Sequence, residues 1–343
     1  MTTVMRAPLK MLTEGDMPSV EDIRACFNAI MDGEISQIQM AAFLTALKMR
    51  GERVEDIAAA AAVMREKATI IDAPDSAMDI VGTGGDGIGT YNISTATAFV
   101  VAGAGVPVAK HGNKAVSSKS GAADVLSSLG IKVDCDMGLV RRALVEAGIC
   151  FLMAPRHHSA MRHVAPVRAE LGVRTIFNML GPLANPALVR RIMVGVFDPA
   201  LCVPFAEALA ALGTTHAWVV HGADGLDEVS TTGPTQVAAL AGGAVTQFAI
   251  SPDDLGLATV GIEALHGGTP DENADSLRAV LDGADGPYRD IVIFNAAAAL
   301  VGGGHAADLA DGAERAITSI ASGRAMAALD TLVTITNGNP EGA

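Results

Sequence analysis

The sequence predicts an α/β fold made of two domains: a small helical domain over residues 1–75 and a larger α/β domain over residues 76–343. A chain of 343 residues suits two domains, at roughly 100–200 residues for each. Apolar residues recur at helical spacing in the first part, whereas short β-branched runs alternate with helical stretches further along. That alternation is typical of a mostly parallel central sheet covered by helices.

The helical domain is predicted from its caps and its apolar stripes. Ser19 with Asp22, and Ser36 with Gln39, have the spacing of capping boxes, which satisfy the first backbone N–H groups of a helix. Apolar side chains follow these caps at intervals of three or four residues: Ile23, Phe27, Ile30, Met40, Leu44 and Leu47. Each stripe gives its helix one apolar face, so we expect residues 17–72 to form a packed group of helices.

The α/β domain is predicted from strands and helices that follow one another along the chain. The predicted strands are residues 79–81, 106–109, 150–153, 192–197 and 217–220. Helical patterns cover residues 122–129, 138–147, 200–212 and the alanine-rich tail 271–337, whereas the alanine-rich helix predicted at 54–67 belongs to the helical domain. Residues 166–190 interrupt the alternation with prolines and glycines. This segment is either an ordered excursion or a crossing back to the helical domain, and we expect part of it to join that domain.

Charge and composition exclude several classes of function. Asp and Glu number 38 against 24 Lys and Arg, a formal net charge of −14. Such a protein repels phosphate polyanions at long range, so we expect neither a nucleic acid nor an anionic membrane as a partner. The four cysteines lack metal-ligand spacing and are expected to be reduced core residues: Cys26, Cys135, Cys150 and Cys202. No secretory signal is recognised, and we expect a soluble, cytoplasmic protein.

A glycine-rich stretch follows the first predicted strand. Residues 82–87 contain four glycines, and Asn92, Ser94 and Thr95 then open a helix. Glycines let backbone N–H groups approach a phosphate closely, and a helix N-terminus adds positive potential. A tight strand-to-helix turn is the alternative, but a turn needs fewer glycines and fewer polar donors. The spacing matches neither a Walker A loop nor a dinucleotide-binding fingerprint.

Residues 110–121 form a second polar stretch, directly after the next predicted strand. They contain three lysines, three serines and two glycines. Open α/β sheets bind ligands at the carboxyl ends of their strands. A local excess of lysine in an acidic chain favours an anion site there over a solvated surface loop. His111 is not assigned as a base, and His157 and His158 are further candidates to line the cleft.

Two more clusters carry charged side chains. Asp227 and Glu228 follow a later strand, and paired carboxylates suit a Mg²⁺ ion that also contacts substrate phosphates. Exposed acidic loop residues are common, however, so this pair alone does not decide the matter. Arg168 lies in an apolar segment, where it either binds a carboxylate or forms a salt bridge with Glu170.

Together these clusters predict a pyrophosphate-like ligand, held with Mg²⁺ by loops at the carboxyl edge of the sheet. In order and spacing the residues resemble the anthranilate phosphoribosyltransferase family, over about residues 8–335. The resemblance rests on five motifs: Gly82-Thr83-Gly84-Gly85-Asp86, Asn92-Ile93-Ser94-Thr95, Lys110-His111-Gly112-Asn113, Asn178-Met179-Leu180-Gly181-Pro182-Leu183 and Asp227-Glu228.

The resemblance implies a fold like that of the nucleoside phosphorylases and this class of phosphoribosyltransferases. It implies transfer of the 5-phosphoribosyl group from phosphoribosyl pyrophosphate (PRPP) to the amine of anthranilate, with release of pyrophosphate. This reaction is the second step of tryptophan biosynthesis from anthranilate. A homodimer that associates through the helical domain, with the substrates between the two domains, is also implied.

The resemblance further implies roles for individual residues. PRPP is expected to contact Gly82, Gly85, Asp86, Thr90, Asn92, Ile93, Ser94, Thr95, Lys110, His111, Gly112, Asn113, Lys114, Ala115, Val116, Ser117, Ser118 and Ala122. Anthranilate is expected at Gly82, Asn113 and Arg168, and Mg²⁺ at Ser94, Asp227 and Glu228. Lys114 stands where the family usually has arginine, and Ala122 where serine often occurs; both departures predict weaker phosphate contacts. We predict catalysis by positioning and electrostatics, without a side-chain base or a covalent intermediate.

Two other functions remain open on the sequence. A pyrimidine nucleoside phosphorylase shares the architecture, but it would not need Asp227 and Glu228 to bind a metal. A nucleic-acid-binding relative on the same fold would carry an extended basic surface, which the net charge of −14 argues against.

Overall fold

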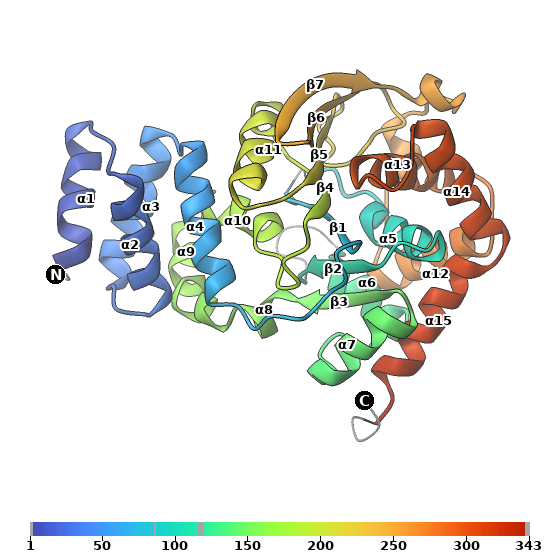
Figure 1. Cartoon of the computed structure of the whole chain (residues 1–343), viewed down its shortest axis with the longest axis horizontal. Coiled ribbons are helices and arrows are strands. Elements are labelled where there is room, and N and C mark those ends of the chain that lie inside the picture. Colours follow the sequence, from blue (N-terminus) through green and yellow to red (C-terminus); the bar gives the residue numbers. More distant parts are fainter. Residues whose placement is uncertain (1–2, 86, 115–119, 340–343) are drawn as a thin grey trace.

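The computed structural model describes residues 3–85, 87–114 and 120–339, and Figure 1 shows a group of helices at one end and a sheet with covering helices at the other. The first four helices are α1 (Thr3–Glu14), α2 (Val20–Met31), α3 (Gln37–Arg50) and α4 (Val54–Glu66). The predicted helical domain is confirmed, although α1 was not expected. Pro8 lies inside α1 and interrupts the helical signal, because proline lacks a backbone N–H and usually ends a helix.

Both predicted caps form. The hydroxyl of Ser19 accepts a hydrogen bond from the backbone N–H of Asp22 (3.1 Å), and that of Ser36 accepts one from Gln39 (3.3 Å). All six apolar residues of the predicted stripes are buried: Ile23, Phe27, Ile30, Met40, Leu44 and Leu47. The stripes therefore form the interior of the helical part, as the spacing predicted.

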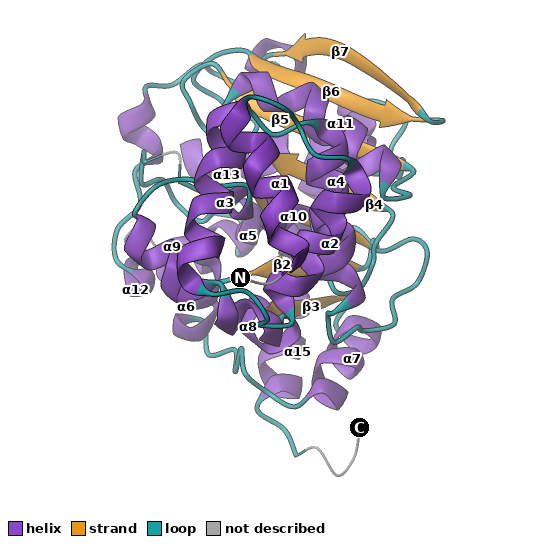
Figure 2. Cartoon of the chain, turned by 90° about the vertical axis from the view of Figure 1, so that its left-hand side faces the viewer, coloured by secondary structure: helices purple, strands orange, loops and turns teal. Residues whose placement is uncertain are grey.

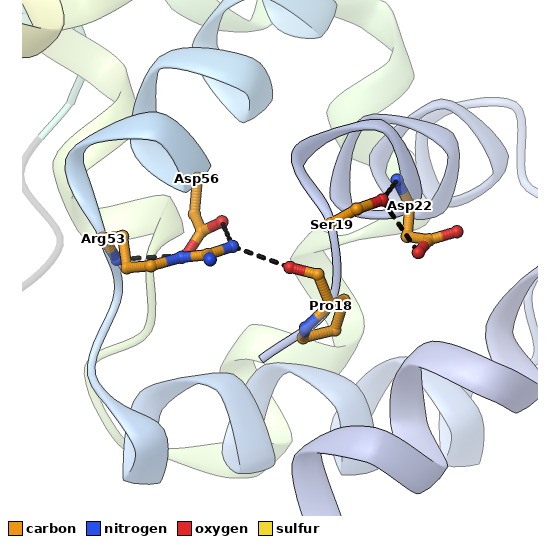
Figure 3. A network of polar contacts seen from close by, with 5 residues as sticks. All are labelled: Pro18, Ser19, Asp22, Arg53 and Asp56. Atoms are coloured by element: carbon orange, nitrogen blue, oxygen red, sulfur yellow. Dashed lines mark hydrogen bonds and ion pairs between the residues drawn. The ribbon is translucent and has the colours of Figure 1, made fainter. Parts of the chain in front are cut away.

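An ion pair at the start of α4 joins this helix to the loop between α1 and α2 (Figure 3). The guanidinium of Arg53 donates to both carboxylate oxygens of Asp56, at 2.7 and 2.9 Å. Another of its N–H groups donates to the carbonyl of Pro18 (2.8 Å), directly before the cap at Ser19. Because the Asp56 side chain is buried, the pair is not an ordinary surface ion pair, and it fixes how these helices meet.

Within the described residues, seven strands form one sheet in the order β3-β2-β1-β4-β5-β6-β7. The strands are β1 (Met78–Gly82), β2 (Val108–Gly112), β3 (Ile149–Met153), β4 (Arg191–Gly195), β5 (His216–Gly222), β6 (Thr235–Ala241) and β7 (Ala244–Ile250). The strands from β3 to β5 in this order pair in parallel, whereas β6 and β7 are antiparallel. The predicted α/β fold with a mostly parallel sheet is confirmed.

The hairpin of β6 and β7 was not predicted, and Figure 2 shows it at the top edge of the sheet. Alanine is frequent in both strands, so they lack the β-branched runs that marked the other strands. One signal was present in the sequence. Gly242 and Gly243 connect the strands with φ of 58° and 80°, which is the backbone that a two-residue hairpin loop requires.

The remaining helices cover the sheet. They are α5 (Ile93–Gly103), α6 (Ala122–Ser128), α7 (Met137–Glu146), α8 (Ala154–His157), α9 (Ala165–Leu171), α10 (Phe177–Leu183), α11 (Cys202–Ala211), α12 (Pro270–Leu281), α13 (Pro287–Gly302), α14 (Leu309–Ala321) and α15 (Arg324–Thr336). Helix α9 packs on α3, and α10 packs on α4. Part of residues 166–190 therefore contacts the helical part. The boundary at residue 75 stays a prediction.

Each face of the sheet has its own core. Met193 of β4 and Trp218 of β5 pack in the core that α5 and α13 share. Val194 and Val219, one position further along each strand, belong to the core that also contains α11 and the N-terminal helices. The helical part packs through α4 against α10 and α11, so it lies on the side of the sheet that this second core covers. All four cysteines are buried thiols, and none of the described helices is long and apolar enough to cross a membrane.

Candidate active site

Three clusters that are far apart in the sequence meet at the carboxyl edge of the sheet. We name them the glycine loop (residues 83–92, after β1), the polar loop (residues 113–121, after β2) and the acidic loop (residues 223–234, after β5). The Oδ2 atom of Asp227 accepts a hydrogen bond from the backbone N–H of Gly84 (2.6 Å). Glu228 accepts one from the N–H of Ser94 (3.0 Å), at the start of α5. The acidic loop therefore contacts both the glycine loop and the helix that follows it.

Lys110 lies beneath these contacts, inside the sheet. Its Nζ donates to the carbonyl of Ile80 (2.6 Å) and to the hydroxyl of Ser94 (3.3 Å). Burial lowers the pKa of Lys110, while the carboxylates of Asp79, Glu228 and Asp227 act in the opposite direction. The neighbouring carboxylates thus favour the charged form of the amine, against the effect of burial.

Lys110 and His111 belong to β2, which corrects the sequence interpretation. The predicted strand ended at residue 109, and both residues were assigned to the polar stretch that follows it. In the structure β2 continues through Gly112, and both side chains are buried. The strand can extend because Lys110 finds polar partners below the sheet edge, so its burial does not leave the amine unpaired.

Sequence reasoning missed two buried residues that organise this edge. The carboxylate of Asp79, in β1, accepts from the backbone N–H of His111 (3.1 Å) and from the side-chain amide of Asn185 (2.7 Å). Asn185 also donates to the carbonyl of Ala109 (2.8 Å) and accepts from the N–H of Ala187 (2.7 Å). Burial raises the pKa of Asp79 to about 6. The sequence signal that could have indicated this buried network is an aspartate inside an otherwise apolar strand.

Two glycines allow the acidic loop to lie against the strand ends. A Cβ on Gly82 would overlap the Oδ2 of Asp227, and a Cβ on Gly195 would overlap the carbonyl oxygen of Asp227. Side chains at these positions would push the acidic loop away from β1 and β4. Gly84 and Gly85 serve a different purpose, because their φ values of 69° and 79° lie in the left-handed region.

Arg174 is a further residue that the sequence interpretation did not single out. Its guanidinium donates to the carbonyl of Gly85 and lies 3.8 Å above the ring centroid of Phe197. A cation held over an aromatic face keeps a defined orientation. Arg174 therefore joins the glycine loop to the segment that follows β4.

Asn92 connects three segments around the glycine loop. Its side-chain amide donates to the backbone carbonyl of Ser120 (3.3 Å) and accepts from the Ser120 hydroxyl (3.1 Å). It also accepts from the side-chain amide of Asn273 in α12 (3.0 Å). The backbone carbonyl of Asn92 accepts from the hydroxyl of Tyr288 (3.3 Å), whose ring stacks on Tyr91 at 4.3 Å. The start of α5 is thus tied to the polar loop and to the C-terminal helices.

The histidines near this edge are buried and neutral at pH 7. The rings of His111 and His158 lie 5.2 Å apart, and burial lowers the pKa of His111 to about 3 and that of His158 to about 4. His111 Nδ1 lies 3.1 Å from the carbonyl of Gly181, and His157 Nδ1 lies 2.6 Å from that of Thr69. None of the three is assigned the role of a base.

Arg168 lies on α9, with its guanidinium 5.9 Å from the ring centroid of Phe177. Burial lowers its pKa. The alternative of a salt bridge to Glu170 is not realised among the ion pairs of residues 3–85, 87–114 and 120–339. Arg168 therefore stands on a helix that packs against α3 of the helical part.

The other predicted residues have varied positions. Asn113 and Lys114 are exposed, and the backbone N–H of Lys114 donates to the side chain of Asn113 (2.8 Å). Thr90 pairs with His266, and the side chain of Ile93 is buried. Gly112 ends β2, Thr95 lies buried in α5, and Ala122 begins α6. Asp86, Ala115, Val116, Ser117 and Ser118 lie outside the described residues.

The residues predicted to hold Mg²⁺ form an all-oxygen set. Among the described residues, no group of three or more histidine, cysteine or acidic side chains could hold a metal ion. The predicted set instead has two carboxylates, Asp227 and Glu228, and the hydroxyl of Ser94, joined by the bond between Glu228 and the Ser94 backbone. Mg²⁺ at phosphate sites typically takes one or two carboxylates and completes its shell with water and phosphate oxygens. The donor set therefore fits the ion.

Comparison with known proteins decides the family. Residues 74–326 match the glycosyl transferase family, a/b domain, and residues 8–68 match its helical bundle domain. Anthranilate phosphoribosyltransferase from Rhodospirillum rubrum is 56% identical over 327 residues, which cover 95% of this chain and 94% of that protein. The chain belongs to the anthranilate phosphoribosyltransferases.

Solved structures agree with this family assignment. The enzyme from Thermus thermophilus has a TM-score of 0.91 at 43% identity, covering 96% of this chain and 99% of that one. The enzyme from Saccharomyces cerevisiae, in complex with PRPP and Mg, has a TM-score of 0.89 at 30% identity, covering 98% of each chain.

Proposed function

We propose that this chain transfers the 5-phosphoribosyl group of PRPP to the amine of anthranilate. The products are N-(5-phosphoribosyl)anthranilate and pyrophosphate, and the reaction is the second step of tryptophan biosynthesis from anthranilate. The observation that carries the proposal is the contact of the acidic loop with the glycine loop and the start of α5. It brings two carboxylates beside backbone N–H donors at one sheet edge, within a chain of this family.

PRPP binds across the glycine and polar loops. Backbone N–H groups near the start of α5 and the buried amine of Lys110 offer the positive potential that the phosphates need. Because the whole chain is acidic, this attraction is local rather than a property of the whole surface. The remaining PRPP contacts are those that the family resemblance assigns to the two loops.

Ser94, Asp227 and Glu228 hold Mg²⁺. When bound, the ion neutralises the charge that grows on the departing pyrophosphate. The residues of the chain itself contribute positioning: Lys110 keeps the hydroxyl of Ser94 directed at the site (3.3 Å). Backbone bonds from Gly84 and Ser94 keep the two carboxylates beside the glycine loop.

Anthranilate binds at Gly82, Asn113 and Arg168, with the guanidinium of Arg168 facing its carboxylate. The aromatic amine has a free lone pair at neutral pH, so it attacks the ribose carbon without a side-chain base. The lowered pKa values of His111 and His158 support this reading, because burial makes both rings poor proton acceptors. Rate enhancement then comes from positioning and from stabilised charge on pyrophosphate.

The chain acts as a cytoplasmic homodimer that associates through the helical part. Two large apolar side chains of α3 support this proposal, since Ile38 is 83% exposed and Met49 is 82% exposed. Such residues are more often covered in an assembly than left in water. Light scattering tests the dimer: the parent should have twice the chain mass, and Ile38→Glu should shift it towards the monomer.

The first experiment follows the fluorescence of anthranilate after mixing the chain with PRPP and Mg²⁺. We expect a rapid loss of the signal that EDTA abolishes, with one pyrophosphate released for each anthranilate consumed. No loss with folded chain and intact PRPP would overturn the proposal. A parallel assay for phosphorolysis of uridine and thymidine distinguishes a pyrimidine nucleoside phosphorylase, which needs phosphate and does not need PRPP.

Arg168→Ala tests the anthranilate side separately. A charge-assisted hydrogen bond is worth about 1.5–3 kcal/mol, so the KM for anthranilate should rise by about ten- to a hundredfold. The KM for PRPP should change little. An equal rise in the KM for anthranilate and the KM for PRPP would mean that Arg168 maintains the overall structure of the site and does not bind the anthranilate carboxylate specifically.

A further inference from the structure

We propose that Asn295 of α13 is a positioning residue for the acidic loop, and through that loop for the carboxylates of Asp227 and Glu228. This inference rests on the proposed function of these carboxylates in Mg²⁺ and PRPP binding. It concerns a residue outside the five sequence motifs, on a helix that belongs to the core behind the sheet. Asn295 acts on the site only through the backbone of Val229.

The side-chain amide of Asn295 holds both backbone groups of Val229, the residue that directly follows Glu228. Its Oδ1 accepts from the N–H of Val229 (3.0 Å), and its Nδ2 donates to the carbonyl of Val229 (2.7 Å). The second N–H of the amide donates to the carbonyl of Ile291 (2.8 Å), one turn earlier in α13. Both Asn295 and Val229 are completely buried.

Only a primary amide of this size satisfies that arrangement. It must present one acceptor and two donors at once, and the structure uses all three. Val229 lies in a loop outside the described strands, so its buried N–H and carbonyl depend on Asn295. Asparagine is unfavourable inside a helix, and its presence in α13 is explained by the loop rather than by the helix.

Other hydrogen bonds hold the residues on either side of Val229, including the backbone N–H of Ser230, whereas Asn295 holds Val229 itself. At the front, Asp227 and Glu228 meet Gly84 and Ser94. At the base, the carboxylate of Asp224 accepts from the hydroxyls of Ser230 (2.6 Å) and Thr232 (2.5 Å). Without the amide at position 295, the backbone next to Glu228 would lose its fixed direction.

Three variants test the proposal. Asn295→Leu keeps the size of the side chain and removes all three hydrogen bonds, while Asn295→Asp keeps the shape and the acceptor for the Val229 N–H. Ile293→Ala is the control: it removes buried volume from the same helix, two residues away and so on a different face. Each chain is examined by thermal melting, by calorimetric titration with PRPP in the presence of Mg²⁺, and by steady-state kinetics.

We expect both Asn295 variants to weaken Mg²⁺-dependent PRPP binding by about ten- to a hundredfold, as loss of a support behind metal ligands does. The anthranilate KM should stay within about threefold, and Ile293→Ala should bind PRPP as the parent does. Hydrogen exchange of the metal-free chains should show faster exchange of the Val229 amide in Asn295→Leu, but not in Asn295→Asp, which keeps the acceptor, nor in Ile293→Ala.

Three results would overturn the inference: unchanged PRPP binding in a folded Asn295 variant, equal weakening in Ile293→Ala, or failure of both Asn295 variants to fold while Ile293→Ala folds. The last would make Asn295 a residue of general stability. If the parent chain itself shows no Mg²⁺-dependent PRPP binding, the proposed function fails. If the parent binds PRPP and the Asn295 variants bind it equally well, only this inference fails.

Discussion

The glycine loop and the acidic loop meet at one edge of the sheet, but they are held in different ways. The acidic loop is fixed from outside by the buried side chain of Asn295 and from within by the half-buried side chain of Asp224. The glycine loop has four residues with positive φ: Gly84, Gly85, Gly87 and Gly89. Three of these four have open space where a Cβ would lie, and the exception, Gly85, meets only the guanidinium of Arg174.

This difference matches what each loop offers a ligand. Carboxylates that bind a cation repel each other, so their positions have to be set by the fold before the ion arrives. Backbone N–H donors are neutral and can adjust to phosphate oxygens as the ligand binds. We therefore expect the site to combine a preorganised acidic side with an adaptable phosphate side. Glu228→Gln, Gly195→Ala and Gly84→Ala test that contrast, and His158→Gln tests the buried histidines beside the site.

Glu228→Gln should have the largest effect, because it removes a carboxylate from the rigid side and keeps its shape. We expect kcat/KM to fall by about 10²–10³-fold, the usual cost of losing one group that stabilises charge in the transition state. The Mg²⁺ concentration for half-maximal rate should rise as well. Asp253→Asn, on an exposed 3₁₀ turn after β7, is the control for loss of one charge. A similar decline in Asp253→Asn would show an effect of net charge alone.

Gly195→Ala should come next, because the new Cβ would overlap the carbonyl oxygen of Asp227. The acidic loop then has to move away from the end of β4. We expect kcat/KM to fall by about ten- to a hundredfold, the range found when the support of a metal site is disturbed. Gly233→Ala is the matched control. This glycine lies in the acidic loop itself, with open space around it and without a positive φ. Equal losses in the two variants would contradict a rigid seat at Gly195.

The local features of both loops could be predicted from the sequence, but the buried residues that hold the loops in place could not. The caps at Ser19 and Ser36, the glycines after β1 and the carboxylates after β5 are visible in sequence because each depends on neighbours a few residues away. Asn185 and Asn295 were not found, because their partners lie 106 and 66 residues away. A buried asparagine has no sequence pattern that distinguishes it from an exposed one. The hairpin β6–β7 was missed for a different reason: its strands are neighbours in the sequence, but pairing, rather than propensity, stabilises their alanine-rich segments.

His158→Gln tests the burial of the histidine pair of His111 and His158 through the pH dependence of stability. The pKa of His158 falls from an ordinary value of 6.5 to about 4 on folding, because burial disfavours the charged ring. Its contribution to stability is therefore complete above pH 6.5 and is lost progressively as the pH falls towards 4. Asp79 acts oppositely, since its raised pKa of about 6 favours folding at lower pH. That contribution is the same in parent and variant, so it cancels in the comparison.

Between pH 7.5 and 5.0, the parent should therefore lose about 1–2 kcal/mol more unfolding free energy than His158→Gln. Urea unfolding, followed by the fluorescence of Trp218, measures the difference. The exposed His266 supplies the control, because His266→Gln should keep the pH dependence of the parent. An unchanged slope in His158→Gln would mean that the ring is protonated in the folded chain, against the geometry of the buried pair with His111.

Gly84→Ala should have the smallest effect and is the sharpest test of the contrast. Its φ of 69° is unfavourable for alanine, at a cost of about 1–2 kcal/mol, but open space surrounds the position. We expect the KM for PRPP to rise by less than about tenfold, with kcat within twofold of the parent. Gly87→Ala has the same strain at φ 78° without a bond to Asp227, so it measures the cost of strain alone, whereas Gly84→Ala can also displace its retained N–H from Asp227. If Gly84→Ala instead loses as much activity as Gly195→Ala, the glycine loop is as rigid as the acidic loop. The phosphate side would then be preorganised too, because a loop able to adjust would absorb one methyl group that meets no neighbour.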